Sequence, residues 1–125
     1  MKLKNFSITL TIVLLISTSL IGCNLLKKTT DWNGNWNTNW GKMTIKVNGN
    51  KATASYEHND GTLDGTINGN EFSGKWYEGS TEPGGNFLFT LKGNKFEGGY
   101  DHNGTNAPDD SLKQDKNSWT GTKSN

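Results

Sequence analysis

The stretch Phe72-Ser73-Gly74-Lys75-Trp76 carries the pattern that decides the fold: a large apolar residue, glycine two positions later, and another apolar residue two positions after that. Residues i, i+2 and i+4 share one face of a β-strand, so each copy places two large side chains on that face with a gap between them. Such a gap lets a curved sheet close on itself. The other copies are Trp32-Gly34-Trp36, Leu63-Gly65-Ile67 and Phe96-Gly98-Tyr100, a truncated one at Trp119-Gly121, and a variant with alanine for glycine at Ala52-Ala54-Tyr56. The repeated pattern predicts the unit of a β-barrel.

Short alternating segments separated by turn residues follow one another from Trp32 to the end of the chain. Within residues 42–47, apolar Met43, Ile45 and Val47 alternate with polar residues, which is the period of a half-buried strand. Asn48-Gly49-Asn50 is a typical tight turn, because asparagine and glycine accept the positive φ that hairpins require. No helical period extends over ten residues after the N-terminal segment. We therefore predict an all-β fold, a small antiparallel up-and-down β-barrel or meander of about eight short strands.

Two architectures satisfy this pattern, a closed barrel and a pair of packed sheets. We favour closure, because the first and last strands both carry tryptophan and glycine on the same face, and pairing them removes two exposed edges. The side chains expected to fill the interior are Trp32, Trp36, Trp40, Met43, Ile45, Val47, Tyr56, Leu63, Ile67, Phe72, Trp76, Phe87, Phe89, Leu91, Phe96, Tyr100 and Trp119. Leu88 is the odd apolar residue that faces outward. An interior so filled leaves room only for a shallow pocket at an open end.

The N-terminus has the order of a bacterial export signal. Lys2 and Lys4 precede an apolar run from Phe6 to Ile16, which is too short to span a membrane comfortably. The run leads into Leu20-Ile21-Gly22-Cys23, which resembles the lipobox of bacterial lipoproteins and contains the only cysteine of the chain. The resemblance implies that Cys23 receives a diacylglyceryl group, that cleavage occurs before it, and that its new amino group is acylated, for example with palmitate. The other interpretation is an ordinary secretory signal with a chance cysteine.

Three segments follow from this interpretation: a lipoprotein signal peptide at 1–22, a lipidated tether at 23–31, and the β-barrel domain at 32–125. Two or three acyl chains anchor a protein stably, so we expect it on the extracytoplasmic side of a membrane of the bacterial cell envelope. Lys27 and Lys28 of the tether either approach lipid headgroups or form a solvated pair. All 13 basic residues are lysines, and 11 of them remain against 12 acidic residues once 1–22 is removed. That balance gives no support for nucleic-acid binding.

A second resemblance concerns the start of the barrel domain. Gly34-Asn35-Trp36, then Gly41 with two apolar alternating positions, then Ala54-Ser55-Tyr56, is similar to the opening of avidin and streptavidin, which are eight-stranded biotin-binding barrels. Tyr56 matches a tyrosine ligand of biotin in that family, whereas Thr38 and Lys42 stand where the family has asparagine and serine. The resemblance implies the barrel fold, and the two departures lead us to expect no biotin binding. Repeated Gly-x-aromatic hairpins also resemble small barrel domains of unassigned role in secreted bacterial proteins.

Two histidines occupy similar settings at the ends of strands, His58 after Tyr56-Glu57 and His102 after Tyr100-Asp101. If both loops lie at the same end of the barrel, His58, His102 and Asp101 could bind a divalent metal. The competing interpretation is two solvated turns. The acidic loop from Asp101 to Asn117 offers oxygen ligands for calcium, but it lacks the spacing of an EF-hand loop.

No combination of residues indicates an enzyme. The chain lacks arginine, its single cysteine is assigned to the lipid, and its serines lie in turns without a paired histidine and acid. We expect no cofactor apart from the lipid on Cys23.

A non-catalytic binding module for a carbohydrate or small molecule is the function we favour. Its candidate ligand-binding residues are the aromatic side chains of Trp40 and Tyr77 and the outward asparagines Asn33, Asn35, Asn37 and Asn39. The asparagines can equally be a solubilising outer face. The alternative function is a structural or protein-interaction lipoprotein of the envelope, which would use an exposed strand edge or the loop from Glu78 to Gly85.

Overall fold

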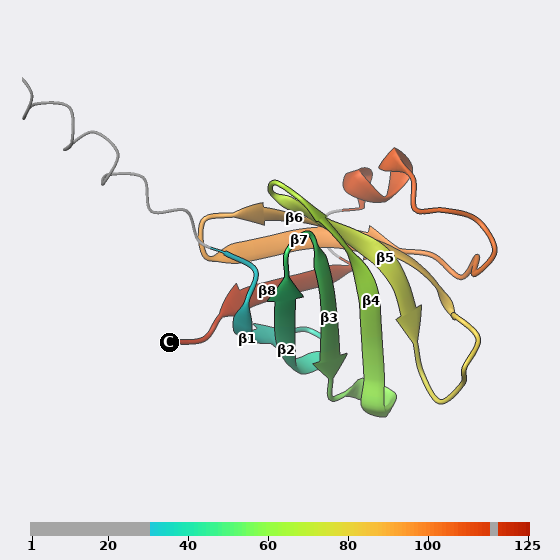
Figure 1. Cartoon of the computed structure of the whole chain (residues 1–125), viewed down its shortest axis with the longest axis horizontal. Helices are drawn as coiled ribbons and strands as arrows, with labels where there is room; N and C mark the ends of the chain where they lie inside the picture. Colours follow the sequence, from blue (N-terminus) through green and yellow to red (C-terminus); the bar gives the residue numbers. More distant parts are fainter. Residues whose placement is uncertain (1–30, 116–117) are drawn as a thin grey trace, which may run out of the picture.

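The computed structural model describes residues 31–115 and 118–125, so the predicted signal peptide, Cys23 and most of the tether lie outside the described residues. Eight antiparallel strands form one closed barrel in chain order (Figure 1). The strands are β1 (Gly34–Thr38), β2 (Gly41–Asn48), β3 (Lys51–Tyr56), β4 (Gly61–Asn68), β5 (Glu71–Tyr77), β6 (Gly85–Lys92), β7 (Lys95–Tyr100) and β8 (Trp119–Lys123). Two short 3-10 turns, η3 (His58–Asp60) and η4 (Asp110–Gln114), lie in loops. The predicted all-β up-and-down barrel is confirmed. Among these residues no helix has the length and apolar character needed to cross a bilayer.

The barrel closes through pairing of its first and last strands. Trp36 lies opposite Lys123, and Thr38 lies opposite Gly121. The pairing is extended on both sides, because the Ser124 N–H donates to the Asn35 carbonyl at 2.9 Å and the Asn39 N–H donates to the Thr120 carbonyl at 3.2 Å. The closed barrel, rather than two packed sheets, is therefore correct.

Glycine permits the closest approach of neighbouring strands. Gly74 of β5 lies opposite Gly65 of β4. A Cβ atom added to Gly74 would lie 2.1 Å from the Asp64 carbonyl oxygen and 2.5 Å from the Gly65 Cα. Because both obstacles are backbone atoms, no side-chain rotation can relieve them. The gap in the Phe72-Ser73-Gly74-Lys75-Trp76 pattern is thus filled by the adjacent strand where the sheet bends.

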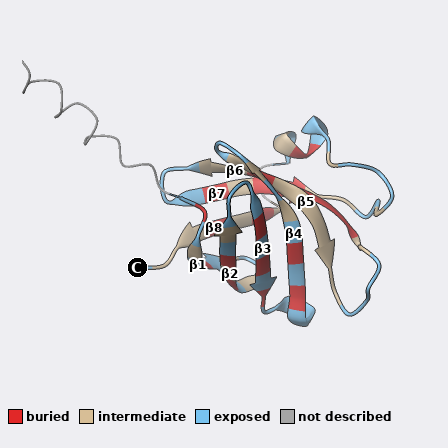
Figure 2. Ribbon diagram, viewed as in Figure 1, coloured by how far each residue is buried: buried red, intermediate tan, exposed pale blue. Residues whose placement is uncertain are grey.

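The interior is packed with the side chains that the alternation assigned to it. Trp36, Phe72, Phe87 and Phe89 are fully buried, and buried and exposed residues alternate along β3 and β4 (Figure 2). Every residue expected to fill the barrel belongs to this core or packs against it while partly buried. Ala52 and Ala54 complete the core where β3 crosses it.

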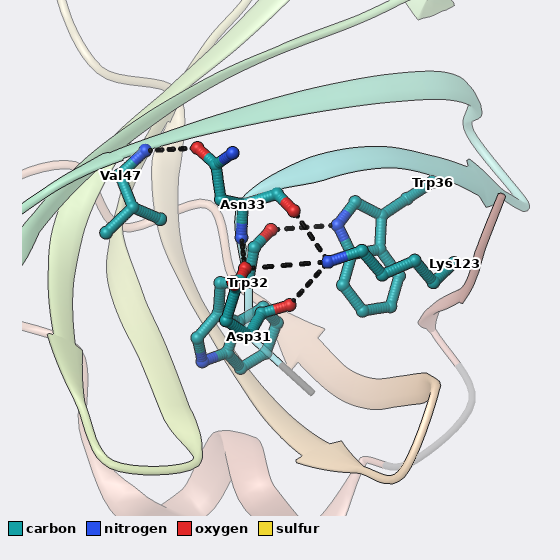
Figure 3. A network of polar contacts seen from close by, with 6 residues as sticks. All are labelled: Asp31, Trp32, Asn33, Trp36, Val47 and Lys123. Atoms are coloured by element: carbon teal, nitrogen blue, oxygen red, sulfur yellow. Dashed lines mark hydrogen bonds and ion pairs between the residues drawn. The ribbon is translucent and has the colours of Figure 1, made fainter. Parts of the chain in front are cut away.

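The end of the barrel where the described chain begins is sealed. Trp32 is 3% exposed and packs against Trp36 and Phe72, with ring centroids 6.0 Å and 5.6 Å away. The Lys123 ammonium donates to the carbonyl oxygens of Asp31 at 2.8 Å and Asn33 at 2.6 Å, and lies 5.4 Å from the Trp36 ring centroid (Figure 3). Trp36 Nε1 donates to the Trp32 carbonyl at 3.0 Å. These contacts hold residues 31–33 across this end of the barrel, where the Trp32 side chain closes the opening.

The long connection between β7 and β8 covers part of the outer surface. Its turn η4 packs on β6 and β7, and Leu112 of η4 is 7% exposed. Leu88 does face away from the barrel interior, as predicted, but it is only 4% exposed. The outward leucine therefore belongs to a small second apolar contact under this connection.

Candidate ligand pocket at the barrel mouth

Alternate connections of an up-and-down barrel meet at the same end. The β1–β2, β3–β4, β5–β6 and β7–β8 connections therefore surround one opening, the barrel mouth, opposite the sealed end. A pocket of about 200 Å³ lies there. Its walls are Trp40, Trp76, Trp119 and Tyr100, with His58, His102 and Glu78 completing the lining. Every one of the four connections, or a strand end beside it, contributes at least one residue.

The aromatic walls stand at right angles around Tyr100. The Tyr100 ring is perpendicular to Trp40 at 90°, to Trp76 at 88° and to Trp119 at 86°, with centroids 5.6 Å, 6.1 Å and 5.8 Å away. Edge-to-face contacts of this kind stabilise aromatic pairs beyond the area they bury. The result is an aromatic box, defined here as Trp40, Trp76, Tyr100 and Trp119.

Hydrogen bonds fix the orientation of two tryptophan walls. Trp40 Nε1 donates to the Ser118 carbonyl at 2.9 Å, and Trp76 Nε1 donates to the Asp101 carbonyl at 2.9 Å. Both bonds reach across to the β7–β8 connection. Trp119 is the most deeply buried member of the box, and its buried indole N–H has no partner among the residues that the structure describes. The indole N–H groups of the three tryptophan walls are therefore bonded or buried, and the polar groups of the lining are the Tyr100 hydroxyl, His58, His102 and Glu78.

A carboxylate is held at the edge of the box. Glu78 Oε1 accepts a hydrogen bond from the Tyr56 hydroxyl at 2.8 Å, and Oε2 accepts one from Asn59 Nδ2 at 3.0 Å. Burial raises the pKa of the Tyr56 hydroxyl, and the hydrogen bond to Glu78 and the charge of that carboxylate raise this pKa further. Tyr56 consequently remains a proton donor at any physiological pH and keeps the carboxylate in place.

Both histidines line the mouth pocket, so their two loops do lie at the same end of the barrel. The His58 ring lies 4.7 Å from Trp40, and the His102 ring lies 5.5 Å from Trp76, measured between centroids. The third candidate metal ligand, Asp101, binds the backbone N–H and side-chain amide of Asn86 and the backbone N–H of Asn103 instead. Within residues 31–115 and 118–125, no three histidine, cysteine or acidic side chains are grouped so that they could hold a metal ion.

Asp101 has a structural position on the outer side of the mouth. Burial tends to raise the pKa of its carboxyl, but hydrogen bonds from Asn86 and Asn103 and the charge of Lys75 outweigh burial and lower it. Asn86 is fully buried, and its Oδ1 accepts a hydrogen bond from the Lys75 ammonium at 2.7 Å. Lys75 also binds the carbonyl oxygens of Gly104 and Asn106. This network fastens the start of the β7–β8 connection to β5 and β6.

The four predicted asparagines are exposed on the outside of the barrel, and three of them make hydrogen bonds that hold strands together. Asn33 Oδ1 accepts from the Val47 N–H at 3.0 Å, and Asn35 Oδ1 accepts from the Thr44 hydroxyl at 2.9 Å. Asn39 Oδ1 accepts from the Thr120 N–H at 2.9 Å. Asn37 is exposed in β1 opposite Lys42. Asn33 and Asn35 therefore tie the first strand to β2, and Asn39 ties its end to β8, where the barrel closes.

The predicted aromatic residues Trp40 and Tyr77 lie on different surfaces. Trp40 is in the mouth pocket, whereas Tyr77 lines a wider depression of about 520 Å³ on the outer faces of β2 to β5. That depression is lined mainly by threonine and serine and contains none of the four asparagines. The structure thus does not assemble Trp40, Tyr77 and the asparagine row into one site.

The three residues compared with biotin ligands of avidin, Tyr56, Thr38 and Lys42, lie in different places relative to the mouth pocket. Tyr56 supports Glu78 beside the pocket, as described above. Thr38 closes the β1–β2 turn, where its hydroxyl donates to the Gly41 carbonyl at 2.6 Å and accepts from the Trp40 N–H at 3.0 Å. Lys42 is exposed on the outer face and, like Thr38, is not among the residues that line the mouth pocket.

Sequence reasoning assigned Trp76, Tyr100 and Trp119 to the core and did not single out Glu78 as a site residue. A signal for the first three was present, because each is the inward-facing residue nearest to the mouth in its strand. Trp76 and Tyr100 are accordingly only partly buried. Comparison of the chain with models of protein families, with curated proteins and with solved structures found no match in any of the three.

Proposed function

We propose that this chain is a non-catalytic binding module that takes a small ligand into the mouth pocket and is held by the lipid on Cys23 at the extracytoplasmic face of a bacterial membrane. The observation that carries the proposal is the aromatic box with a carboxylate beside it, at the open end of a barrel whose interior is otherwise full. Binding sites combine aromatic walls with a few fixed polar groups in this way. The oriented walls need little reorganisation when a ligand enters, which favours affinity.

The position of the tether supports a pocket that faces away from the membrane. Asp31 lies at the sealed end of the barrel, and the stretch from Cys23 to Asp31 can reach at most about 28 Å when extended. Lysines at that end, Lys51, Lys92, Lys95 and Lys123, flank the turns and the tether exit. Lys92 and Lys123 are already paired with Glu97 and Asp31, so the attraction of about 1 kcal/mol per lysine near an anionic membrane surface applies to Lys51 and Lys95. Anchoring from this end would leave the mouth open to the surroundings.

A ligand screen by thermal shift tests the proposal. The panel contains monosaccharides, disaccharides, organic cations, amino acids and biotin, and saturable stabilisation by one class is the expected result. A ligand at 100 times its dissociation constant should add about 2.7 kcal/mol to the free energy of unfolding. Biotin should give no shift, because Thr38 and Lys42 do not line the pocket.

Two matched variants locate the binding. Trp40→Leu removes a wall of the aromatic box, whereas Tyr77→Leu removes an aromatic ring from the outer depression. The ligand shift should be lost in Trp40→Leu and kept in Tyr77→Leu. Capture of one envelope protein together with no shift from any small ligand would instead support the alternative of a protein-interaction lipoprotein.

A further inference from the structure

Building on the proposed function, we propose that the ligand of the mouth pocket carries an organic cation, a quaternary or otherwise alkylated ammonium group, held in the aromatic box beside Glu78. The faces of aromatic rings carry negative electrostatic potential and attract cations that are large and weakly hydrated. Trp40, Trp76 and Trp119 each stand within 6.1 Å of Tyr100 at nearly 90°. Trp40 and Trp119 are inclined to each other at 50°. Rings in several orientations surround a compact, rounded group better than a flat one.

The hydrogen-bonding capacity of the box argues against a sugar. Trp40 Nε1 and Trp76 Nε1 are already bonded to backbone carbonyls, and Trp119 Nε1 is buried from solvent. A sugar that entered would lose water from several hydroxyls and would have only the Tyr100 hydroxyl, the two histidine rings and Glu78 in the lining as replacement partners, and each unpaired buried hydroxyl is costly. An alkylated ammonium group has few or no hydrogen bonds to lose, so ring surface suffices for it.

The charge around the mouth also favours a cation. Glu78 lies in the lining, and its position is fixed by Tyr56 and Asn59. The connections at residues 39–40, 57–60, 78–84 and 101–118 carry eight acidic residues, Glu57, Asp60, Glu78, Glu82, Asp101, Asp109, Asp110 and Asp115, against two lysines, Lys113 and Lys116, and Lys42 lies on the outer face where β2 begins. Lys75, the nearest basic residue in β5, faces outward and is bonded to Asn86. The excess of acidic residues around this opening disfavours an anionic ligand and favours a cation.

The size of the pocket restricts which part of a ligand enters. Its volume of about 200 Å³ is below the range of about 300–1,000 Å³ that encloses drug-sized molecules. It suits a head group of a few heavy atoms, with the remainder of the ligand projecting through the mouth.

The test compares choline with its neutral isostere 3,3-dimethylbutan-1-ol, which has the same shape without the charge. Full-length protein in detergent is titrated at pH 8 and constant ionic strength while tryptophan fluorescence is recorded, because three of the five tryptophans form the box. Tetramethylammonium chloride against sodium chloride gives a second charged probe. Choline should bind saturably and at least about tenfold more tightly than the isostere.

Glu78→Gln keeps the shape of the side chain and removes its charge, and Glu82→Gln makes the same change on an exposed part of the same loop. Glu78→Gln should weaken choline binding about tenfold and leave binding of the isostere unchanged, which also shows that the pocket is intact. Glu82→Gln should change the dissociation constant of neither choline nor the isostere by more than about twofold.

Two other results would contradict the cation inference or the proposed function. Equal binding of choline and the isostere, or saturable binding of a sugar without binding of choline, overturns the cation inference and leaves the proposed binding module standing. An absence of any small-ligand response in fluorescence and in the thermal-shift panel overturns both.

Discussion

Replacing Gly74 by valine tests whether the glycine gap is required for barrel closure. The new Cβ would lie 2.1 Å from the Asp64 carbonyl oxygen, whereas ordinary contact begins at 3.4 Å, so the backbones of β4 and β5 would have to move apart to make up a deficit of about 1 Å. Overpacking typically costs about 1–3 kcal/mol, and we expect the upper part of this range because the obstacle is backbone. In a domain of this size a loss of about 3 kcal/mol lowers Tm by roughly 12–24 °C.

The assay is thermal unfolding followed by circular dichroism, with urea unfolding as a second measure of stability. Thr66→Val is the matched control, because it introduces valine on the exposed outer face of β4, one residue from Gly65. Such surface changes usually alter stability by no more than about 0.5 kcal/mol. A Gly74→Val protein with the Tm of the unchanged chain would refute the claim that neighbouring strands touch through this gap.

Two further predictions concern the anchor and the response to acid. Cys23→Ala should abolish incorporation of labelled fatty acid and release the protein from membranes, and persistent membrane retention would contradict the lipid anchor. The lowered pKa of Asp101 means that the unfolded chain takes up the proton first as pH falls. The stability that Asp101 contributes is therefore present above its usual pKa of 3.8 and is lost as pH falls through the lower folded value. Between pH 6 and pH 2 the free energy of unfolding should decrease less in Asp101→Asn than in the unchanged protein. If the two proteins lose stability in parallel, Asp101 makes no such contribution.

Most of the barrel could be predicted because the information is local. Alternation with period two assigns each side chain to the inside or the outside of a strand, as for Phe87, Leu88 and Phe89. Asparagine and glycine mark the turns, and Gly49, Gly69 and Gly93 do adopt the positive φ expected of them. The pairing of β1 with β8 was predicted from the tryptophan and glycine that both strands carry on the same face, together with the physical argument that pairing removes two exposed edges.

The candidate site could be predicted only in part. Trp40 was chosen for its position at a strand end, and a shallow pocket was expected at an open end of the filled barrel. His58 and His102 were expected to meet if their loops shared an end, which holds for every second connection of a meander. The asparagine row was misleading as a guide to this pocket, because its polar groups stabilise strand pairing at β1 instead.

By itself the sequence determined which face each side chain occupies and where the chain turns, and it carries the lipobox-like motif at Cys23 on which the predicted anchor rests. Only the tertiary structure decided how far along the barrel axis each inward residue lies. Depth depends on strand register and tilt, which arise from all eight pairings together. For that reason Phe72 is fully buried against Trp32 at the sealed end, whereas Trp76, with the same alternation four residues later, becomes a wall of the pocket. Likewise the position of Glu78 is fixed by hydrogen bonds from Tyr56 and Asn59. These two residues lie about 20 positions before Glu78 in the sequence, and the tertiary structure brings them next to it.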